Sequence, residues 1–252
     1  MHANASLDEI VAYLDGLLEV QKFASEVGSN GLLHRAGPGV SKIAVALNTS
    51  LTTIAGAVKA GAQLLVVHHT SWPGIDLHLH DEKLQIMGAA GLSLYGAHAA
   101  LDCAPGFSTG WVLAELLGVS VDTTFLEYEG GQAGVAGSCA GTFADLIQRA
   151  RELLRVEVEA HEHAKSFGRV GIVPGGGIWT SWMDEARRLG CDTYVTGEVS
   201  MYTRMFAKEC GMNLLIGTHY ATEAPAIRAL GERLSAHAGI PCEFIAESPD
   251  VF

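Results

Sequence analysis

The chain has 252 residues, of which 48% are hydrophobic and 17% charged, and this composition excludes a disordered or fibrous protein. Its formal net charge of −12 argues against general binding to nucleic-acid backbones, which requires a surplus of Lys and Arg. No apolar run approaches the ~18 residues of a membrane span, and the N-terminus carries acids where a signal peptide is basic and apolar. We therefore expect a soluble, cytoplasmic protein that does not bind membranes.

The first predicted helix is followed by a unit that repeats along the chain. Ser6 and Glu9 have the spacing of a capping box ahead of an amphipathic helix. The repeating unit is an alanine-rich amphipathic stretch, a glycine, a short apolar run and a polar residue. In three copies the polar residue lies eight positions after the glycine: Gly61 to His69, Gly190 to Glu198 and Gly211 to His219. Looser copies end at His98 and Glu247.

This unit predicts a helix, a glycine in the left-handed conformation, a buried strand and a polar side chain at the strand's carboxyl end. Helices that alternate with short apolar strands indicate an α/β fold with mainly parallel or mixed sheets and helices packed on them. In such sheets, ligands bind outside the carboxyl ends of the strands. The polar residues of the repeat are therefore candidate site residues.

Two strand–loop–helix–glycine–strand blocks, which start near Lys42 and Arg169, indicate an internal duplication. It predicts two similar α/β domains, the first made of residues 1–127 with 216–252 and the second of residues 128–215. The stretch 127–141 contains five glycines, and we expect a loop or linker there.

Imidazole and carboxylate groups recur at a spacing that suits metal binding. His98 and Asp102, like His219 and Glu223, are four residues apart, so a helical turn after the strand brings each pair onto one face. This donor set fits zinc, iron, manganese, cobalt or nickel, whereas calcium requires oxygen ligands alone. The adjacent His68 and His69 can share a site if the strand ends between them, because neighbouring side chains of a strand point to opposite faces.

Four motifs in order resemble the Nif-three-like dinuclear-metal-centre proteins, which carry the name GTP cyclohydrolase I type 2 homologues. The motifs occupy residues 68–72, 95–102, 196–198 and 217–223, and the resemblance covers nearly the whole chain. It implies two similar α/β domains and a toroidal homohexamer, a trimer of dimers. It also implies two divalent metal ions per subunit with Glu223 as the bridging ligand, and the full ligand set is His68, His69, Asp102, His219 and Glu223. The first domain would carry most of these ligands.

Three further features bear on the substrate. Tyr202 and Asn48 replace a histidine and an aspartate that are common in the family, and these changes affect substrate identity more than metal binding. A glycine-rich loop, made of Gly175, Gly176 and Gly177, lies between a strand and a helix. It is either a plain tight turn or a contact for phosphate, since loop amides and a helix N-terminus can bind anions.

The resemblance and the donor set favour a metal-dependent hydrolase that acts on a nucleotide or phosphoester. Glu223 would then be a catalytic ligand, and His98 and Glu198 would orient ligands or transfer protons. The alternative is a non-enzymatic ring assembly that binds, delivers or senses metal.

Overall fold

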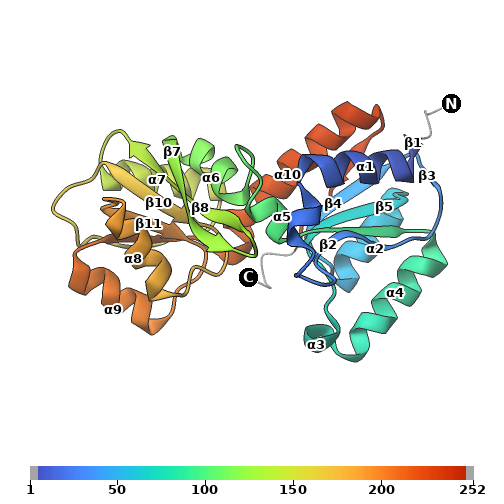
Figure 1. Ribbon diagram of the computed structural model, residues 1–252, viewed down its shortest axis with the longest axis horizontal. Helices are drawn as coiled ribbons and strands as arrows, with labels where there is room; N and C mark the ends of the chain where they lie inside the picture. The colour runs from blue at the N-terminus through green and yellow to red at the C-terminus, as the bar shows by residue number, and fades with distance from the viewer. Residues whose placement is uncertain (1–4, 248–252) are drawn as a thin grey trace. The chain divides into compact units, whose positions relative to one another are not determined.

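A computed structural model describes residues 5–247, and these form two compact units (Figure 1). Unit 1 consists of residues 5–104, 129–131 and 227–247, and unit 2 consists of residues 105–128 and 132–226. The chain thus leaves unit 1 after residue 104 and, apart from residues 129–131, returns to it only within helix α10 (His219–Ala238). The ends of the predicted first domain, residues 1–4 and 248–252, lie outside the described residues.

Unit 1 is built on a five-stranded sheet of order β13-β4-β5-β6-β2. Strands β4, β5, β6 and β13 run parallel, and β2 is the antiparallel edge strand. A short ribbon pairs β1 (Ala5–Ser6) with β3 (Gly39–Val40). The sheet strands are β2 (Asn30–His34), β4 (Ile43–Asn48), β5 (Leu64–His69), β6 (Ser93–Ala97) and β13 (Cys242–Phe244).

Helices cover both faces of this sheet (Figure 1). Helices α2 and α4 pack on the face that carries Ala44, Leu65 and Leu94, while α10 packs against Val45 on the opposite face, which α1 shares. The central strands β4, β5 and β6 are buried almost throughout, so their side chains fill an apolar layer on each face of the sheet. The helices of unit 1 are α1 (Leu7–Leu17), the 3-10 helix η1 (Val20–Phe23), α2 (Leu51–Ala60), α3 (Pro73–Asp76), α4 (His78–Ala90) and α5 (Ala99–Asp102).

Unit 2 has a six-stranded mixed sheet of order β7-β8-β10-β11-β12-β9, in which β10, β11 and β12 are parallel. Helices α6 and α7 cover one face, and α8 and α9 cover the other (Figure 1). The strands are β7 (Val119–Tyr128), β8 (Gly131–Cys139), β9 (Glu159–His161), β10 (Arg169–Val173), β11 (Thr193–Thr196) and β12 (Asn213–Ile216). The helices are α6 (Thr109–Leu117), α7 (Phe143–Leu154), α8 (Thr180–Arg188) and α9 (Met201–Cys210).

The predicted repeat is confirmed in both units. Unit 1 contains the run β4-α2-β5-α4-β6, and unit 2 contains the run β10-α8-β11-α9-β12, with three parallel strands each. The glycines that end the helices of the repeat have positive φ angles, as a left-handed C-terminal residue requires. They are Gly61, Gly91, Gly190, Gly211 and Gly239, with φ between 66° and 83°.

The loop predicted for residues 127–141 is wrong, because most of this stretch belongs to a β-hairpin of β7 and β8. Gly134 and Gly137, which lie within β8, serve close packing rather than chain breaking. A Cβ atom on Gly134 would lie 2.8 Å from the Phe125 ring, and one on Gly137 would overlap the Ser120 carbonyl group. The small residues thus let the two strands and their aromatic neighbour approach one another.

The capping box predicted at Ser6 and Glu9 is also wrong, although α1 begins at Leu7 as expected. The Ser6 side chain makes no capping hydrogen bond. Ser6 instead pairs with Gly39 in the ribbon, and the Leu7 amide donates to the Pro38 carbonyl, so the helix start is satisfied by backbone. Among the described residues, no helix is both long enough and apolar enough to cross a membrane.

We expect opposite stability effects from the same substitution at two glycines. Gly137→Ala should destabilise the protein by ~1–3 kcal/mol, because its methyl group collides with the β7 backbone. Gly16→Ala should stabilise it by ~0.5–1 kcal/mol, because Gly16 is exposed in α1 with nothing within 4 Å of the added atom. Urea unfolding monitored by circular dichroism measures both, and a wild-type midpoint for Gly137→Ala would contradict this account of the hairpin.

Candidate metal centre

In unit 1, polar residues gather where three neighbouring parallel strands end. Asn48 is the last residue of β4, His68 and His69 are the last residues of β5, and His98 directly follows β6. Because the strands are parallel, their carboxyl ends lie at the same edge of the sheet. This is the edge at which the sequence predicts a ligand site.

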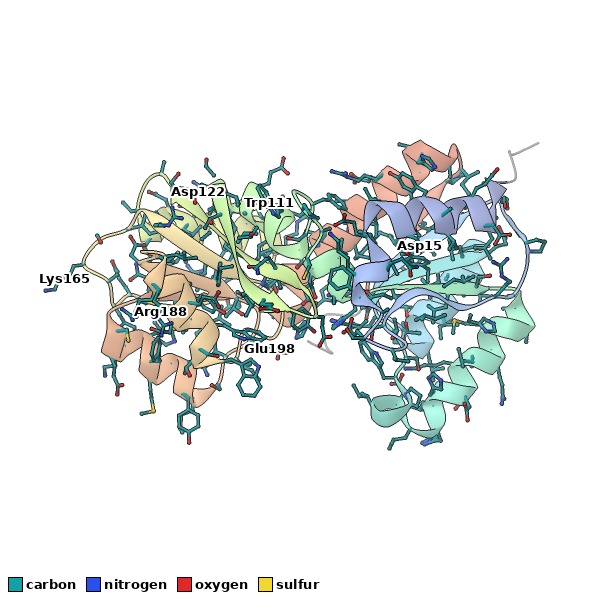
Figure 2. All side chains as sticks on the ribbon, viewed as in Figure 1. Asp15, Trp111, Asp122, Lys165, Arg188 and Glu198 are labelled. Atoms are coloured by element: carbon teal, nitrogen blue, oxygen red, sulfur yellow. The ribbon has the colours of Figure 1, made fainter. Side chains whose placement is uncertain are left out.

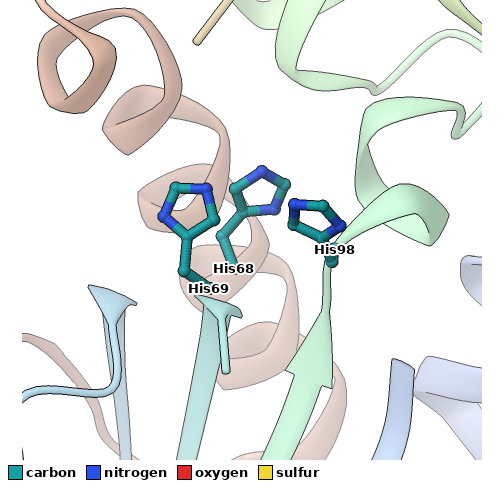
Figure 3. A group of neighbouring side chains, drawn as sticks. All are labelled: His68, His69 and His98. Carbon is teal, nitrogen blue, oxygen red and sulfur yellow. The ribbon is translucent and has the colours of Figure 1, made fainter. Parts of the chain in front are cut away.

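Three histidines form a compact group at this edge, which Figure 3 shows. The His68 ring centroid lies 4.6 Å from that of His69 and 5.0 Å from that of His98, and the His69 and His98 centroids are 5.5 Å apart. One nitrogen of each ring lies within 4.8 Å of the other two. Such a group could hold a divalent metal ion.

Asp102 belongs to the same group. The Asp102 amide donates to the His98 carbonyl, so a helical turn after β6 does join the two residues, as their spacing predicts. Asp102 Oδ1 lies 3.5 Å from His68 Nε2. The expectation that β5 ends between His68 and His69 is wrong, since the strand runs to His69. The two ring centroids are nevertheless only 4.6 Å apart.

Each of the three histidines has its Nδ1 atom held by an oxygen acceptor. His68 Nδ1 donates to the Ala97 carbonyl at 2.8 Å, His69 Nδ1 to Asn48 Oδ1 at 2.6 Å, and His98 Nδ1 to Glu26 Oε1 at 2.5 Å. Because these oxygens accept only, each Nδ1 atom carries a proton and each ring is held in one orientation. Metal-binding histidines are oriented in the same way.

Two of these acceptors are themselves held by neighbours. Asn48 donates from its Nδ2 atom and its backbone amide to the two carboxylate oxygens of Glu247, at 2.8 and 2.9 Å, so its Oδ1 atom must face His69. Burial raises the pKa of Glu247 despite these bonds. Glu26 accepts from Asn30 Nδ2 at 2.7 Å. Burial alone would raise the Glu26 pKa, but the bonds from His98, Asn30 and the Ala99 amide lower it.

Sequence reasoning missed Glu26 and left Glu247 without a role. Glu26 lies in the segment between η1 and β2, which has no periodic pattern, and it reaches His98 across 72 positions of sequence. Glu247 ends the looser copy of the repeat and was identifiable by that position alone. The side-chain oxygen of Asn48, which the sequence associates with substrate identity, is the acceptor for His69.

Unit 2 carries a second group of candidate ligands. Glu198 follows β11, and His219 and Glu223 occupy the first two turns of α10, which begins after β12. His219 Nδ1 lies 3.1 Å from Glu198 Oε1, and His219 Nε2 lies 3.2 Å from Glu223 Oε2. Glu223 is buried, whereas the Glu198 side chain, labelled in Figure 2, is 54% exposed. The predicted pairing of His219 and Glu223 on one helix face is confirmed.

The charges of this second group favour a cation. Burial lowers the His219 pKa, but the carboxylates of Glu223 and Glu198 outweigh it and raise the pKa to about 9. A protonated His219 offsets one of the two negative charges, which leaves an acidic group in a partly buried position. Imidazole nitrogen with carboxylate oxygen is a donor set of first-row divalent ions, so the residues present in both units fit such a metal.

The glycine-rich loop after β10 uses its amides within unit 2. The Gly175 amide donates to Thr222 Oγ1 at 3.0 Å, the Gly177 amide to Thr196 Oγ1 at 3.1 Å, and the Ile178 amide to the Gly176 carbonyl at 2.7 Å. Gly175 lies directly against the second group, next to Glu223 and His219. The predicted phosphate contact of Gly175, Gly176 and Gly177 stays a prediction.

Comparison with known proteins identifies the family. The sequence model of the family described as Duf34/NIF3 (NGG1p interacting factor 3) matches residues 5–250. The chain belongs to the Duf34/NIF3 family. A relative from Deinococcus radiodurans named GTP cyclohydrolase 1 type 2 homolog is 32% identical over 247 residues, which cover 94% of this chain and 92% of the relative. A relative of the same name from Escherichia coli is 28% identical over 246 residues, with 88% and 90% covered.

Solved structures of other proteins share the fold. A protein described as ybgI, of unknown function, matches with a TM-score of 0.86 and 28% identity over 97% of this chain and 99% of its own. Reduced HcgD from Methanocaldococcus jannaschii matches with a TM-score of 0.83 and 22% identity over 98% of this chain and 100% of its own. The predicted α/β class and the family resemblance are both confirmed.

We expect Asn48→Ala to weaken metal binding by ~10–100-fold, because His69 loses the acceptor that orients it. Asn48→Asp keeps an oxygen at that position and should retain more of the affinity, although it places a second carboxylate beside Glu247. Competition with a chelating dye, using Zn²⁺ as the probe, measures both variants. Equal affinity for wild type and Asn48→Ala would show that the hydrogen bond to His69 Nδ1 does not support a ligand.

Proposed function

We propose that this Duf34/NIF3 protein binds two divalent metal ions per chain and hydrolyses a nucleotide or phosphoester. The proposed ligands are His68, His69, Asp102, His219 and Glu223, with Glu223 shared by the two ions. The observation that carries the proposal is the group of three histidines in unit 1, each oriented by an oxygen acceptor at Nδ1 and close enough together to hold a metal ion. Metal-binding histidines are typically oriented by such acceptors.

The second group supports the same proposal from within unit 2. Two carboxylates face the two nitrogens of His219, so this group attracts a cation and cannot be a neutral packing cluster. Divalent ions held by carboxylate and imidazole acidify water and so supply a hydrolytic nucleophile near neutral pH. In the proposal Glu198 orients His219 through Nδ1, and His98, held by Glu26, transfers protons at the reacting group.

The substrate class and the assembly rest on the family. The name GTP cyclohydrolase 1 type 2 homolog, which the relatives carry, supports a nucleotide as the substrate. Tyr202 is 66% exposed on α9, where it can contact a substrate rather than the core. We also propose a homohexameric ring, a trimer of dimers, from the resemblance. A ring that binds or delivers metal without turnover is the second candidate function.

Metal binding and activity should be lost together in Glu223→Ala. Wild type loaded with Zn²⁺ or Mn²⁺ should contain two equivalents per chain by elemental analysis, and the variant should contain fewer. Its hydrolysis of nucleotides and phosphoesters should fall by more than about 100-fold, since loss of a ligand exceeds the ~10–100-fold effect of losing an outer partner. Glu232→Ala, at an exposed site of the same helix, is the matched control.

Three outcomes separate the candidate functions. A Glu223→Ala variant with two equivalents and full activity would remove this site from consideration. A wild type that binds two equivalents but turns over no member of a nucleotide and phosphoester panel would favour the metal-binding ring. Turnover of one substrate that Glu223→Ala abolishes would favour the enzyme.

Metal should also stabilise the folded chain. Zn²⁺ at 100 times its dissociation constant should add ~2.7 kcal/mol to the free energy of unfolding, because it binds the folded state alone. Thermal unfolding with and without a chelator measures this difference. An unchanged melting temperature would argue that the ligands do not form a preorganised site.

A further inference from the structure

We propose that Gly175 is a positioning residue for the metal ligands of unit 2, and that the loop after β10 acts as a template for Glu223, His219 and Glu198. This inference rests on the proposed metal function. It assigns the glycine-rich loop to ligand placement, whereas its sequence pattern is also compatible with a phosphate contact. Three sets of contacts within unit 2 support it.

The first is steric. A Cβ atom on Gly175 would overlap Oε1 of Glu223, and it would lie 2.8 Å from Cδ of Glu223 and 2.9 Å from Nε2 of His219. Gly175 also has a φ angle of +63°, which disfavours any residue with a side chain. No other residue type at position 175 leaves both ligands where they lie. The Glu223 carboxylate therefore occupies the space that a side chain at position 175 would need.

The second is the set of hydrogen bonds made by the Gly175 peptide group. Its amide donates to Thr222 Oγ1, and Thr222 precedes Glu223 in α10. Its carbonyl accepts from the amides of Gly197 at 3.1 Å and Glu198 at 2.8 Å. One residue thus connects the loop after β10, the turn after β11 and the start of α10. These segments supply all three members of the second group.

The third concerns the neighbouring glycine and the amides. A Cβ atom on Gly197 would lie 2.7 Å from both the Gly175 carbonyl oxygen and Thr222 Oγ1, so the turn after β11 is equally tight. The amides of Gly175, Gly177 and Ile178 already donate to Thr222 Oγ1, Thr196 Oγ1 and the Gly176 carbonyl, respectively. An anion would have to replace these bonds. The loop is thus built to hold its neighbours in place.

The experiment compares alanine at three glycines. Gly175→Ala should lower Zn²⁺ affinity by ~10–100-fold, the range for residues that orient ligands without binding metal. Gly176→Ala should keep wild-type affinity, because its Cβ would meet only His219 Cε1, at 3.8 Å. Gly61→Ala introduces a side chain at a φ of +74° with nothing within 4 Å, so it controls for backbone strain alone. Affinity is measured with Zn²⁺ as the only added ligand, in phosphate-free buffer.

Thr222→Val provides a second variant should Gly175→Ala fail to fold, as judged by circular dichroism. It keeps the size of the buried Thr222 side chain but removes the acceptor for the Gly175 amide. We expect a smaller loss of Zn²⁺ affinity than in Gly175→Ala, with no loss of a ligand. A folded Gly175→Ala with wild-type affinity would overturn the inference, and so would wild-type affinity in Thr222→Val when Gly175→Ala is unfolded.

The test also separates this inference from the proposed function. Wild-type protein that binds no Zn²⁺ would refute the metal function itself. Wild-type protein that binds Zn²⁺, with equal affinity in Gly175→Ala, would refute only the positioning role. A third outcome concerns inorganic phosphate. If metal-free wild type binds phosphate, and both Gly175→Ala and Gly176→Ala lose this binding while their Zn²⁺ affinity is unchanged, the loop would be a phosphate site and the positioning role would be refuted.

Discussion

Four neighbouring strands of unit 1 and three of unit 2 pair in parallel, and in each unit their carboxyl ends lie at one edge of the sheet. Every candidate ligand lies at or just beyond such an end, because backbone pairing stops there and side chains become free to face a ligand. A helix that stops at a left-handed glycine sets the length of each connection, so the polar residue arrives at a fixed distance from the glycine. The chemistry of the protein depends on this alignment of strand ends.

The two groups meet the demands of a metal in different ways. In unit 1 the acceptors on the Nδ1 atoms fix which nitrogen carries the proton, so the three rings are preorganised before any ion arrives. In unit 2 the carboxylates on both sides of His219 create a negative environment, to which the raised pKa of this imidazole is a response. A proton there stands in for the positive charge that a divalent ion would bring. Both groups combine imidazole nitrogen with carboxylate oxygen, a donor set that suits first-row metals.

Sequence periodicity predicted the elements that carry the site but not the residues behind it. The spacing from Gly61 to His69 and from Gly211 to His219 follows from the lengths of the turn and the strand after each helix. These lengths depend on short stretches of sequence, so a sequence pattern can reveal them. Glu26 acts on His98 through a tertiary contact from a non-periodic segment, so no local pattern could reveal it. The glycines near residue 134 were misread for a related reason. A glycine within a strand can make room for an aromatic ring, and a glycine elsewhere can end a strand. The sequence does not distinguish the two roles, because the difference depends on the neighbouring strand.

The same ambiguity explains why the glycine-rich loop is hard to interpret from its residues. Consecutive glycines can expose amides to an anion, turn the chain, or make room for another side chain, and the sequence of the loop is equal in all three cases. The three roles differ in which acceptors the glycine amides bind and in which atoms a Cβ would contact. At Gly175 the amide donates to Thr222 Oγ1, and a Cβ would contact Glu223 and His219. A residue without a side chain therefore sets the positions of two residues that have one, and it does so without being part of the donor set.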